Sequence, residues 1–136
     1  MKFELDTPPD GQRIKRYSER SVVVNDTEVE HTFIVTNDRL LIDVELPPLL
    51  QLDVTAVGMF LELGPDIVVI GCGSRQQMID TRLMAELMQA GVGVEVMDTP
   101  AACRCFNVLS GENRRVAAAL YPIDDSNLRD PSGLRE

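Results

Sequence analysis

The chain has 136 residues, a length typical of one domain that buries its own core without disulfides or bound metal. Hydrophobic residues make up 44% of it and aromatic residues 4%, so we expect a core built mainly of aliphatic side chains. The formal net charge of −9 repels phosphate backbones and argues against nucleic acid as a partner.

The thiols and the lone imidazole do not form a metal-binding pattern. Cys103 and Cys105 lie two residues apart, and Cys72 and His31 stand far from them in the sequence. This spacing lacks the paired ligands of a zinc site, and the odd number of cysteines favours reduced thiols. We therefore predict neither a metal nor a cofactor.

The sequence also lacks the features of a membrane or secreted protein. No segment approaches the roughly 18 to 20 consecutive apolar residues of a transmembrane helix. The charged N-terminus lacks the apolar stretch of a secretory signal. We expect a soluble protein of the bacterial cytoplasm without a membrane span.

The first fifty residues have the alternation and turn residues of β structure. Turns are expected at residues 7–11, which include two prolines and a glycine, and at Asn25 and Asp26. Pro47 and Pro48 close this section. Strands are expected at residues 2–6, 14–20, 21–24, 32–35 and 40–45, with His31 in or next to the fourth.

After the prolines, helices and strands alternate. Asp53 and Asp80 are suitable N-caps for helices over residues 54–63 and 81–90, and Thr99 followed by Pro100 predicts a third helix over residues 100–109. Glycines at positions 64, 91 and 111 provide the stops. Strands are expected at residues 67–70, 94–97 and 116–120, and the first and last of these are expected to be buried.

This order of elements predicts the α/β class. Helices between successive strands imply parallel pairing for at least three strands, with the β-rich N-terminal section extending or flanking a mixed, partly parallel sheet. Residues 1–123 are expected to form a single domain. Residues 124–136 are rich in polar residues, proline and glycine, and are expected to be a flexible tail.

Residues that could bind a ligand follow two of the predicted strands. Gly71, Cys72, Gly73 and Arg75 follow one strand, and Asp98 with Thr99 follows the next. Ligands of parallel sheets gather at the carboxyl ends of strands, so both groups are expected on one rim. The two glycines and the acid also allow a dinucleotide interpretation, but position 76 is glutamine where a third glycine belongs. The alternative is a tight turn without a ligand.

Cys103 is a candidate nucleophile. The first turn of a helix and the neighbouring Arg104 both lower the pKa of a thiol. Asp98 opposes the thiolate, however, and His31 is too distant in the sequence to serve as an obvious base. Cys103 and Cys105 lie about 200° apart on a helix, so they cannot face one pocket together. The alternative is that Cys103 packs in the core.

Asp98 and Arg104 also have two interpretations. An acid at a helix N-terminus that pairs with an arginine in the next turn commonly fixes a loop. Alternatively, Arg75 and Arg104 could form an anion pocket with the free amides that follow Thr99.

Three segments together resemble the Mth-domain family of unknown function. They are residues 71–73 (GCG), 91–109 (GVGVEVMDTPAACRCFNVL) and 115–120 (RVAAAL). The family includes a mitochondrial assembly factor of complex I and an adipogenesis-associated protein. The resemblance implies a single three-layer α/β domain with a central mixed sheet, and no defined reaction or cofactor. We expect two departures from the family: no mitochondrial targeting segment, and Cys72 and Cys105 where hydroxyl-bearing residues such as threonine are expected.

These observations lead to one main hypothesis and one alternative. The main hypothesis is a non-enzymatic protein-interaction or assembly module with unidentified protein partners, for which a respiratory complex is one candidate. The alternative is a small-molecule or anion binder, or a thiol-dependent enzyme that uses Cys103. The expected working surface spans residues 71–75 and 98–107, with these binding residues: Gly71, Cys72, Gly73, Arg75, Asp98, Thr99, Arg104 and Asn107.

Overall fold

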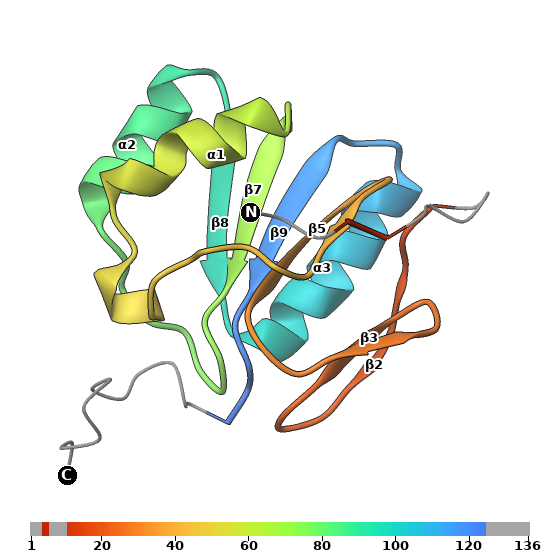
Figure 1. Ribbon diagram of the computed structural model, residues 1–136. Helices are drawn as coiled ribbons and strands as arrows, with labels where there is room; N and C mark the ends of the chain where they lie inside the picture. Colours follow the sequence, from red (N-terminus) through yellow and green to blue (C-terminus); the bar gives the residue numbers. More distant parts are fainter. Residues whose placement is uncertain (1–3, 6–10, 125–136) are drawn as a thin grey trace, which may run out of the picture.

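The computed structural model describes residues 4–5 and 11–124 and contains two β-sheets and three α-helices in that part of the chain (Figure 1). The larger sheet has six strands in the order β1-β6-β5-β9-β7-β8, and the smaller has the order β2-β3-β4. The expected tail, residues 124–136, lies outside the described residues except for Asp124. The strands are β1 (Glu4–Leu5), β2 (Ile14–Tyr17), β3 (Val22–Val24), β4 (Thr27–Val29), β5 (Phe33–Thr36), β6 (Leu40–Leu41), β7 (Ile67–Gly71), β8 (Gly93–Met97) and β9 (Val116–Leu120).

The larger sheet is mixed, as the sequence predicts. β7 lies between β8 and β9 and pairs in parallel with both, which confirms the three parallel strands. β5 pairs with β9 in antiparallel fashion, and β6 and β1 continue the sheet beyond it. The N-terminal section therefore both extends the sheet, through β1, β5 and β6, and flanks it, through β2, β3 and β4.

Helices cover the two faces of the larger sheet. The helices are α1 (Val57–Glu62), α2 (Thr81–Gln89) and α3 (Thr99–Gly111), with 3-10 turns η1 (Leu49–Gln51) and η2 (Val54–Ala56) before α1. Leu83 and Leu87 of α2 pack with Val68 and Ile70 of β7 on one face. Phe106 of α3 packs with the opposite face of the same strand. All five residues of β7 are buried, as expected for a strand with helices on both sides.

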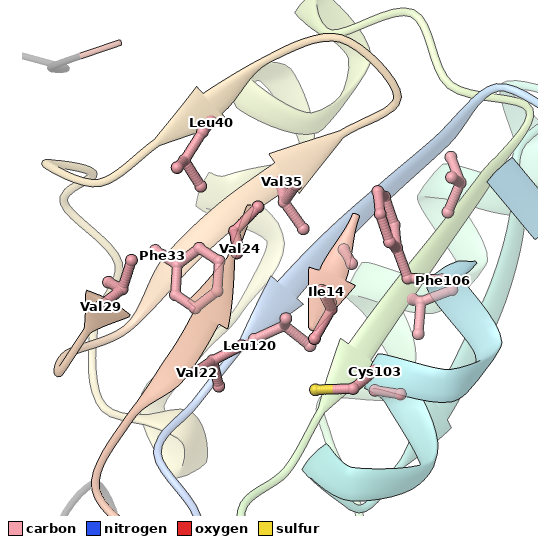
Figure 2. Packing of buried hydrophobic residues seen from close by; sticks show 14 of the residues in the cluster. Ile14, Val22, Val24, Val29, Phe33, Val35, Leu40, Cys103, Phe106 and Leu120 are labelled. Atoms are coloured by element: carbon pink, nitrogen blue, oxygen red, sulfur yellow. The ribbon is translucent and has the colours of Figure 1, made fainter. Parts of the chain in front are cut away.

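The smaller sheet joins α3 in covering its face. Ile14, Val22 and Val24 contact the core that contains Phe33 and Phe106 (Figure 2). The layers are thus α1 and α2, the six-stranded sheet, and α3 with the small sheet. This confirms the three-layer α/β architecture implied by the resemblance.

Several sequence predictions for the N-terminal section were wrong in detail. The strands expected at residues 14–20 and 40–45 are shorter, at Ile14–Tyr17 and Leu40–Leu41. β4 was not predicted, although Asn25, with a φ of 53°, makes the reversal that leads into it. His31 lies outside any strand and is exposed. The helix expected at residues 54–63 begins as a 3-10 turn and becomes α-helical only at Val57.

Candidate functional site

The two predicted strand ends meet at one edge of the sheet. β7 and β8 are parallel neighbours, so residues 71–75 and 98–99 follow them on the same side. The Cys72 amide donates to the Met97 carbonyl at 2.8 Å, and the Thr99 amide donates to the Gly73 carbonyl at 2.8 Å. We call residues 71–75 together with 98–99 the rim. Its two segments are hydrogen-bonded to each other rather than held apart.

Thr99 links three elements from inside the rim. Its side chain is fully buried, and its hydroxyl accepts from the Gly73 amide at 2.8 Å and donates to the Tyr121 carbonyl at 2.7 Å. A Cβ at Gly71 would lie only 3.0 Å from the Thr99 hydroxyl oxygen, so a side chain at this position would force its neighbours to shift. Gly71, Gly73 and Thr99 therefore hold the ends of β7, α3 and β9 together.

The N-cap of α3 differs from the prediction. Asp98 is the cap, and its side chain accepts from the Ala101 amide at 2.7 Å. Thr99 is the first helical residue, because its hydroxyl is turned inward toward Tyr121. Both residue types are good caps, but only one can precede the helix. Asp98 thus stabilises the start of α3.

Several backbone amides at the rim and in the first turn of α3 are already bonded. Hydrogen bonds given above already use the amides of Gly73, Thr99 and Ala101. The Ala102 amide donates to the Asp98 carbonyl at 2.9 Å, and Pro100 has no backbone N–H. A phosphate would have to displace these bonds. The geometry therefore offers no support to the dinucleotide or anion interpretations of this loop.

The cleft beside Arg104 is lined by neither Arg75 nor Asp98, so the predicted pocket of two arginines is not formed there. Arg104 donates to the Tyr17 hydroxyl at 3.0 Å, on the side of α3 that faces β2. Among the described residues, Asp98 and Arg104 form no ion pair. Arg75 is exposed on the loop after β7. The side chains of Arg75 and Arg104 remain the accessible positive groups among the predicted binding residues.

Asn107 has a structural role that its position in the sequence did not reveal. Its side-chain oxygen accepts from the Ile14 amide at 3.0 Å, and its side-chain nitrogen donates to the Ile14 carbonyl at 2.8 Å. This pair of bonds holds β2 against α3. A cleft of about 160 Å³ between these elements is lined by Ile14, Lys15, Arg16, Tyr17, Cys103, Arg104 and Asn107.

The pKa values of the three thiols are raised, whereas those of reactive cysteines are lowered. Burial raises the pKa of Cys103 to about 12, despite the neighbouring Arg104, and Asp98 adds to the rise. Burial also raises the pKa of Cys72, and that of Cys105, where the Glu95 carboxylate contributes. Cys103 packs among the apolar side chains beside Phe106 (Figure 2). The environment of Cys103 therefore does not activate it as a nucleophile.

An apolar cleft opens beside the rim, between the loop that follows it, α2 and β8. It has a volume of about 170 Å³, and Met78 at its mouth is 87% exposed. Met84 and Val96 form part of its wall. We call this feature the Met78 cleft; its lining residues are Gln76, Gln77, Met78, Ile79, Thr81, Met84 and Val96. The sequence analysis missed it, because a single methionine in a polar loop gives no periodic signal.

A second hollow lies at the same end of the sheet. Phe33 pairs with Leu120, so the segment before β5 and the segment after β9 are neighbours. The hollow has a volume of about 390 Å³ and includes His31 with two carboxylates, Glu30 and Asp43. Its full lining is Glu30, His31, Thr32, Ile42, Asp43, Val44, Leu46 and Pro122.

Two further properties bear on metal binding and on membranes. In the described part of the chain, no group of three or more His, Cys, Asp or Glu residues is placed to hold a metal ion. No helix among the described residues is both long and apolar enough to span a bilayer.

Comparison with known sequences identifies related proteins. Residues 14–121 match the family described as "Protein of unknown function (DUF498/DUF598)". A zebrafish (Danio rerio) protein named NADH dehydrogenase [ubiquinone] 1 alpha subcomplex assembly factor 3 is 41% identical over 74 residues, which cover 53% of this chain and 42% of the relative. The protein of the same name from Xenopus tropicalis is 32% identical over 111 residues, which cover 80% of this chain and 60% of the relative. The match thus spans about half the length of these curated relatives.

A bacterial relative has a different name. The "13 kDa major membrane protein" of Francisella tularensis is 24% identical over 107 residues, which cover 78% of this chain and 87% of the relative.

Solved structures share the fold. A crystal structure of a Bordetella parapertussis protein superposes with a TM-score of 0.77 at 27% identity, covering 85% of this chain and 99% of that one. An NMR structure of a Xanthomonas campestris protein gives a TM-score of 0.75 at 33% identity, covering 83% and 86%. A Bordetella pertussis protein described as a Mth938-like domain gives 0.74 at 24% identity, covering 93% and 95%, which supports the fold.

Proposed function

We propose that this chain, which belongs to the DUF498/DUF598 family of proteins of unknown function, is a protein-interaction module that helps to assemble a multi-subunit respiratory complex. The membership confirms the family resemblance recognised in the sequence. Two relatives are named as assembly factors of NADH dehydrogenase, and the biochemical activity of the family is unknown. An assembly factor acts by binding other proteins, so the proposal requires a surface suited to a protein partner.

The exposure of Met78 is the observation that carries the proposal. Met78 is 87% exposed although the residues around its loop are fixed, since Ile79 is buried and Asp80 caps α2 through the Arg82 amide at 2.8 Å. Methionine is flexible and polarizable, and it is common at surfaces that bind protein partners.

The surroundings of Met78 extend this apolar surface. Met88, which is 55% exposed, follows Met84 by one turn on α2. Exposed apolar side chains are ordinary when scattered, whereas a cluster beside a cleft is characteristic of an interaction site. Arg75 lies three residues before Met78 in the same loop and is exposed. We therefore propose that the partner docks at the Met78 cleft, with the rim beneath it as a rigid support.

No observation favours the alternative of a thiol-dependent enzyme. The pKa of Cys103 is raised by burial, and its side chain lies in the core. The amides of Gly73, Thr99 and Ala101, which an anion at the start of α3 would meet, are already hydrogen-bonded. These features favour a structural role for most of the predicted binding residues, with Arg75 and Arg104 as the accessible exceptions.

We further propose that the protein acts in the cytoplasm. A net charge of −9 disfavours attachment to anionic lipid surfaces. Because a Francisella relative is named a membrane protein, cell fractionation is the appropriate test. Recovery in the soluble fraction at low salt would support the proposal, and recovery with membranes after a high-salt wash would overturn it.

Site-specific cross-linking tests the docking surface. A photoreactive amino acid is placed at position 78 and, as a matched control, at position 61, where Leu61 is 38% exposed near the opposite end of the sheet. We expect position 78 to capture one defined protein in growing cells, and this protein to be a subunit or assembly intermediate of a respiratory complex. Equal capture from both positions, or no capture from position 78, would contradict the proposal.

A further inference from the structure

β8 forms one edge of the larger sheet and presents free backbone groups there. It is the last strand in the sheet order and pairs only with β7 among the described strands. The Gly93 amide donates to the Asp66 carbonyl at 2.9 Å, and the Met97 carbonyl accepts from Cys72 at 2.8 Å. Since backbone groups alternate in direction along a strand, residues 93, 95 and 97 face β7. The amides and carbonyls of Val94 and Val96 therefore point away from the sheet.

Apolar side chains flank this edge on both faces. On one face, Val96 lines the Met78 cleft together with Met84. On the other face, Cys105 of α3 and Met97 both pack against the core that contains Phe106, and Val108 follows Cys105 by one turn with 57% exposure. An added strand would therefore bury apolar surface on both of its sides in addition to forming hydrogen bonds. This combination is typical of recognition by strand addition.

The charge of the edge determines what kind of strand fits. Glu95 is the only charged residue of β8, and it is exposed. It lies on the α3 face, where its charge contributes to the raised pKa of Cys105. An opposite charge across a strand pair stabilises the pair, whereas a like charge destabilises it. A strand with lysine or arginine next to Glu95 is therefore favoured.

The same charge disfavours a second copy of this chain. Two copies related by a two-fold axis would pair their β8 strands in antiparallel fashion. The register that joins Val94 of each copy to Val96 of the other places the two Glu95 side chains directly opposite each other. Each chain also carries a net charge of −9. Charge thus favours a basic segment of another protein over self-association.

We propose that an extended basic segment of a partner protein adds to the larger sheet as a strand alongside β8. The segment alternates apolar residues, which lie on the α2 face beside the Met78 cleft, with a lysine or arginine that meets Glu95. Its backbone bonds to the outward amides and carbonyls of Val94 and Val96. This inference rests on the proposed function and specifies how the partner is recognised.

Synthetic peptides test the proposal on the full chain. The probe is a ten-residue peptide of alternating valine and lysine; one control replaces lysine with glutamate, and another replaces valine with proline. The proline control keeps the charge but cannot form a strand. We expect the valine–lysine peptide to slow hydrogen exchange at the Val94 and Val96 amides, measured by NMR, and neither control to do so. Slowing by the proline control, or binding without protection of these amides, would overturn the proposal.

Two pairs of variants separate backbone from side-chain effects. Val94→Pro removes the outward backbone amide but none of the groups that bond to β7. Val94→Ala also removes the valine side chain but keeps the amide, so it is the matched control. We expect the proline variant to bind the valine–lysine peptide about three- to tenfold more weakly than the alanine variant. Equal affinity would contradict strand addition.

Glu95→Lys provides a test that does not depend on the proline variant folding. The exchanged charge should reverse the preference, so that the valine–glutamate peptide binds better than the valine–lysine peptide by about threefold or more. Glu95→Gln, the neutral control, should show little preference. An unchanged preference in Glu95→Lys would overturn the charge argument.

The outcomes distinguish this inference from the proposed function. If cross-linking from position 78 captures an assembly partner but the Val94 and Val96 amides stay unprotected, docking at the cleft stands and strand addition fails. If the amides are protected but position 78 captures nothing, strand addition stands and docking at the Met78 cleft fails. Concentration-dependent dimerisation that protects both amides without peptide would overturn the proposal in favour of a second copy.

Discussion

Replacing Thr99 by valine tests whether the rim is held together by the Thr99 hydroxyl. The substitution keeps the shape of the side chain but leaves the Gly73 amide and the Tyr121 carbonyl without their partner at 2.8 and 2.7 Å. Each buried group that loses its hydrogen bond costs about 1–3 kcal/mol. The added methyl group returns about 0.8 kcal/mol. We therefore expect the free energy of unfolding to fall by about 1–5 kcal/mol.

Urea denaturation with a second readout at the rim measures this effect. Thr99→Ser is the matched control, because it keeps the hydroxyl and loses one methyl group, at a cost of about 1 kcal/mol. Hydrogen exchange at the Gly73 amide should accelerate in the valine variant and remain slow in the serine variant. A valine variant as stable as the wild type, with the Gly73 amide still protected, would refute the assignment of Thr99 as the link between β7, α3 and β9.

Three further predictions concern the thiols, the packing and the pH dependence. Because burial raises the pKa of Cys103 to about 12, this thiol should react with iodoacetamide more slowly than Cys105, and its reaction rate should keep rising above pH 9. Labelling is measured by mass spectrometry, and preferential labelling of Cys103 at neutral pH would contradict its burial. Gly71→Ala should lower the free energy of unfolding by about 1–3 kcal/mol, since its Cβ would meet three side-chain atoms at 3.0–3.1 Å. The control Gly58→Ala meets no atom within 4 Å and should be neutral or stabilising when both variants are compared in thermal melts. A hydrogen bond from the Arg115 side chain lowers the pKa of Asp66, so Asp66 contributes stability that is present above its unfolded pKa and is lost as the pH falls toward its folded pKa. Asp66→Asn should weaken this loss of stability in acid, and plots of unfolding free energy against pH that run parallel for the two proteins would speak against the pair.

The parallel half of the fold was predictable because its signals are local. The β-branched run that ends at Ile70 is bounded by an aspartate and a glycine, and Asp53 and Asp80 cap the helices that they precede. Such segments require no knowledge of distant contacts. The alternation of these helices with strands then implied the parallel order that β8, β7 and β9 adopt.

The small sheet and the exact cap were not predictable because distant residues decide them. Asn107 holds the Ile14 backbone across 93 positions of the sequence. Thr99 and Asp98 are both suitable caps, and the choice between them depends on the Tyr121 carbonyl, 22 residues away from Thr99. Neither contact leaves a periodic pattern in the sequence.

For the two strand ends, the sequence predicted that they lie together but not what their residues do. It placed the residues that follow β7 and β8 on one edge, as the structure has them. It did not show that Gly73 and Thr99 use their polar groups on each other. The exposure of Met78 depends on how its loop lies against α2, which residue types alone do not reveal.

Complementation with a charged Met78 variant tests the central claim most directly. A strain that lacks this protein receives the wild type, Met78→Glu or, as the control, Leu61→Glu, and the amount of assembled respiratory complex is measured on native gels. Both substitutions place a carboxylate on an exposed apolar position, 87% exposed at Met78 and 38% at Leu61. We predict that the wild type and Leu61→Glu restore assembly and that Met78→Glu, although folded, does not. Full restoration by Met78→Glu would contradict docking at the Met78 cleft.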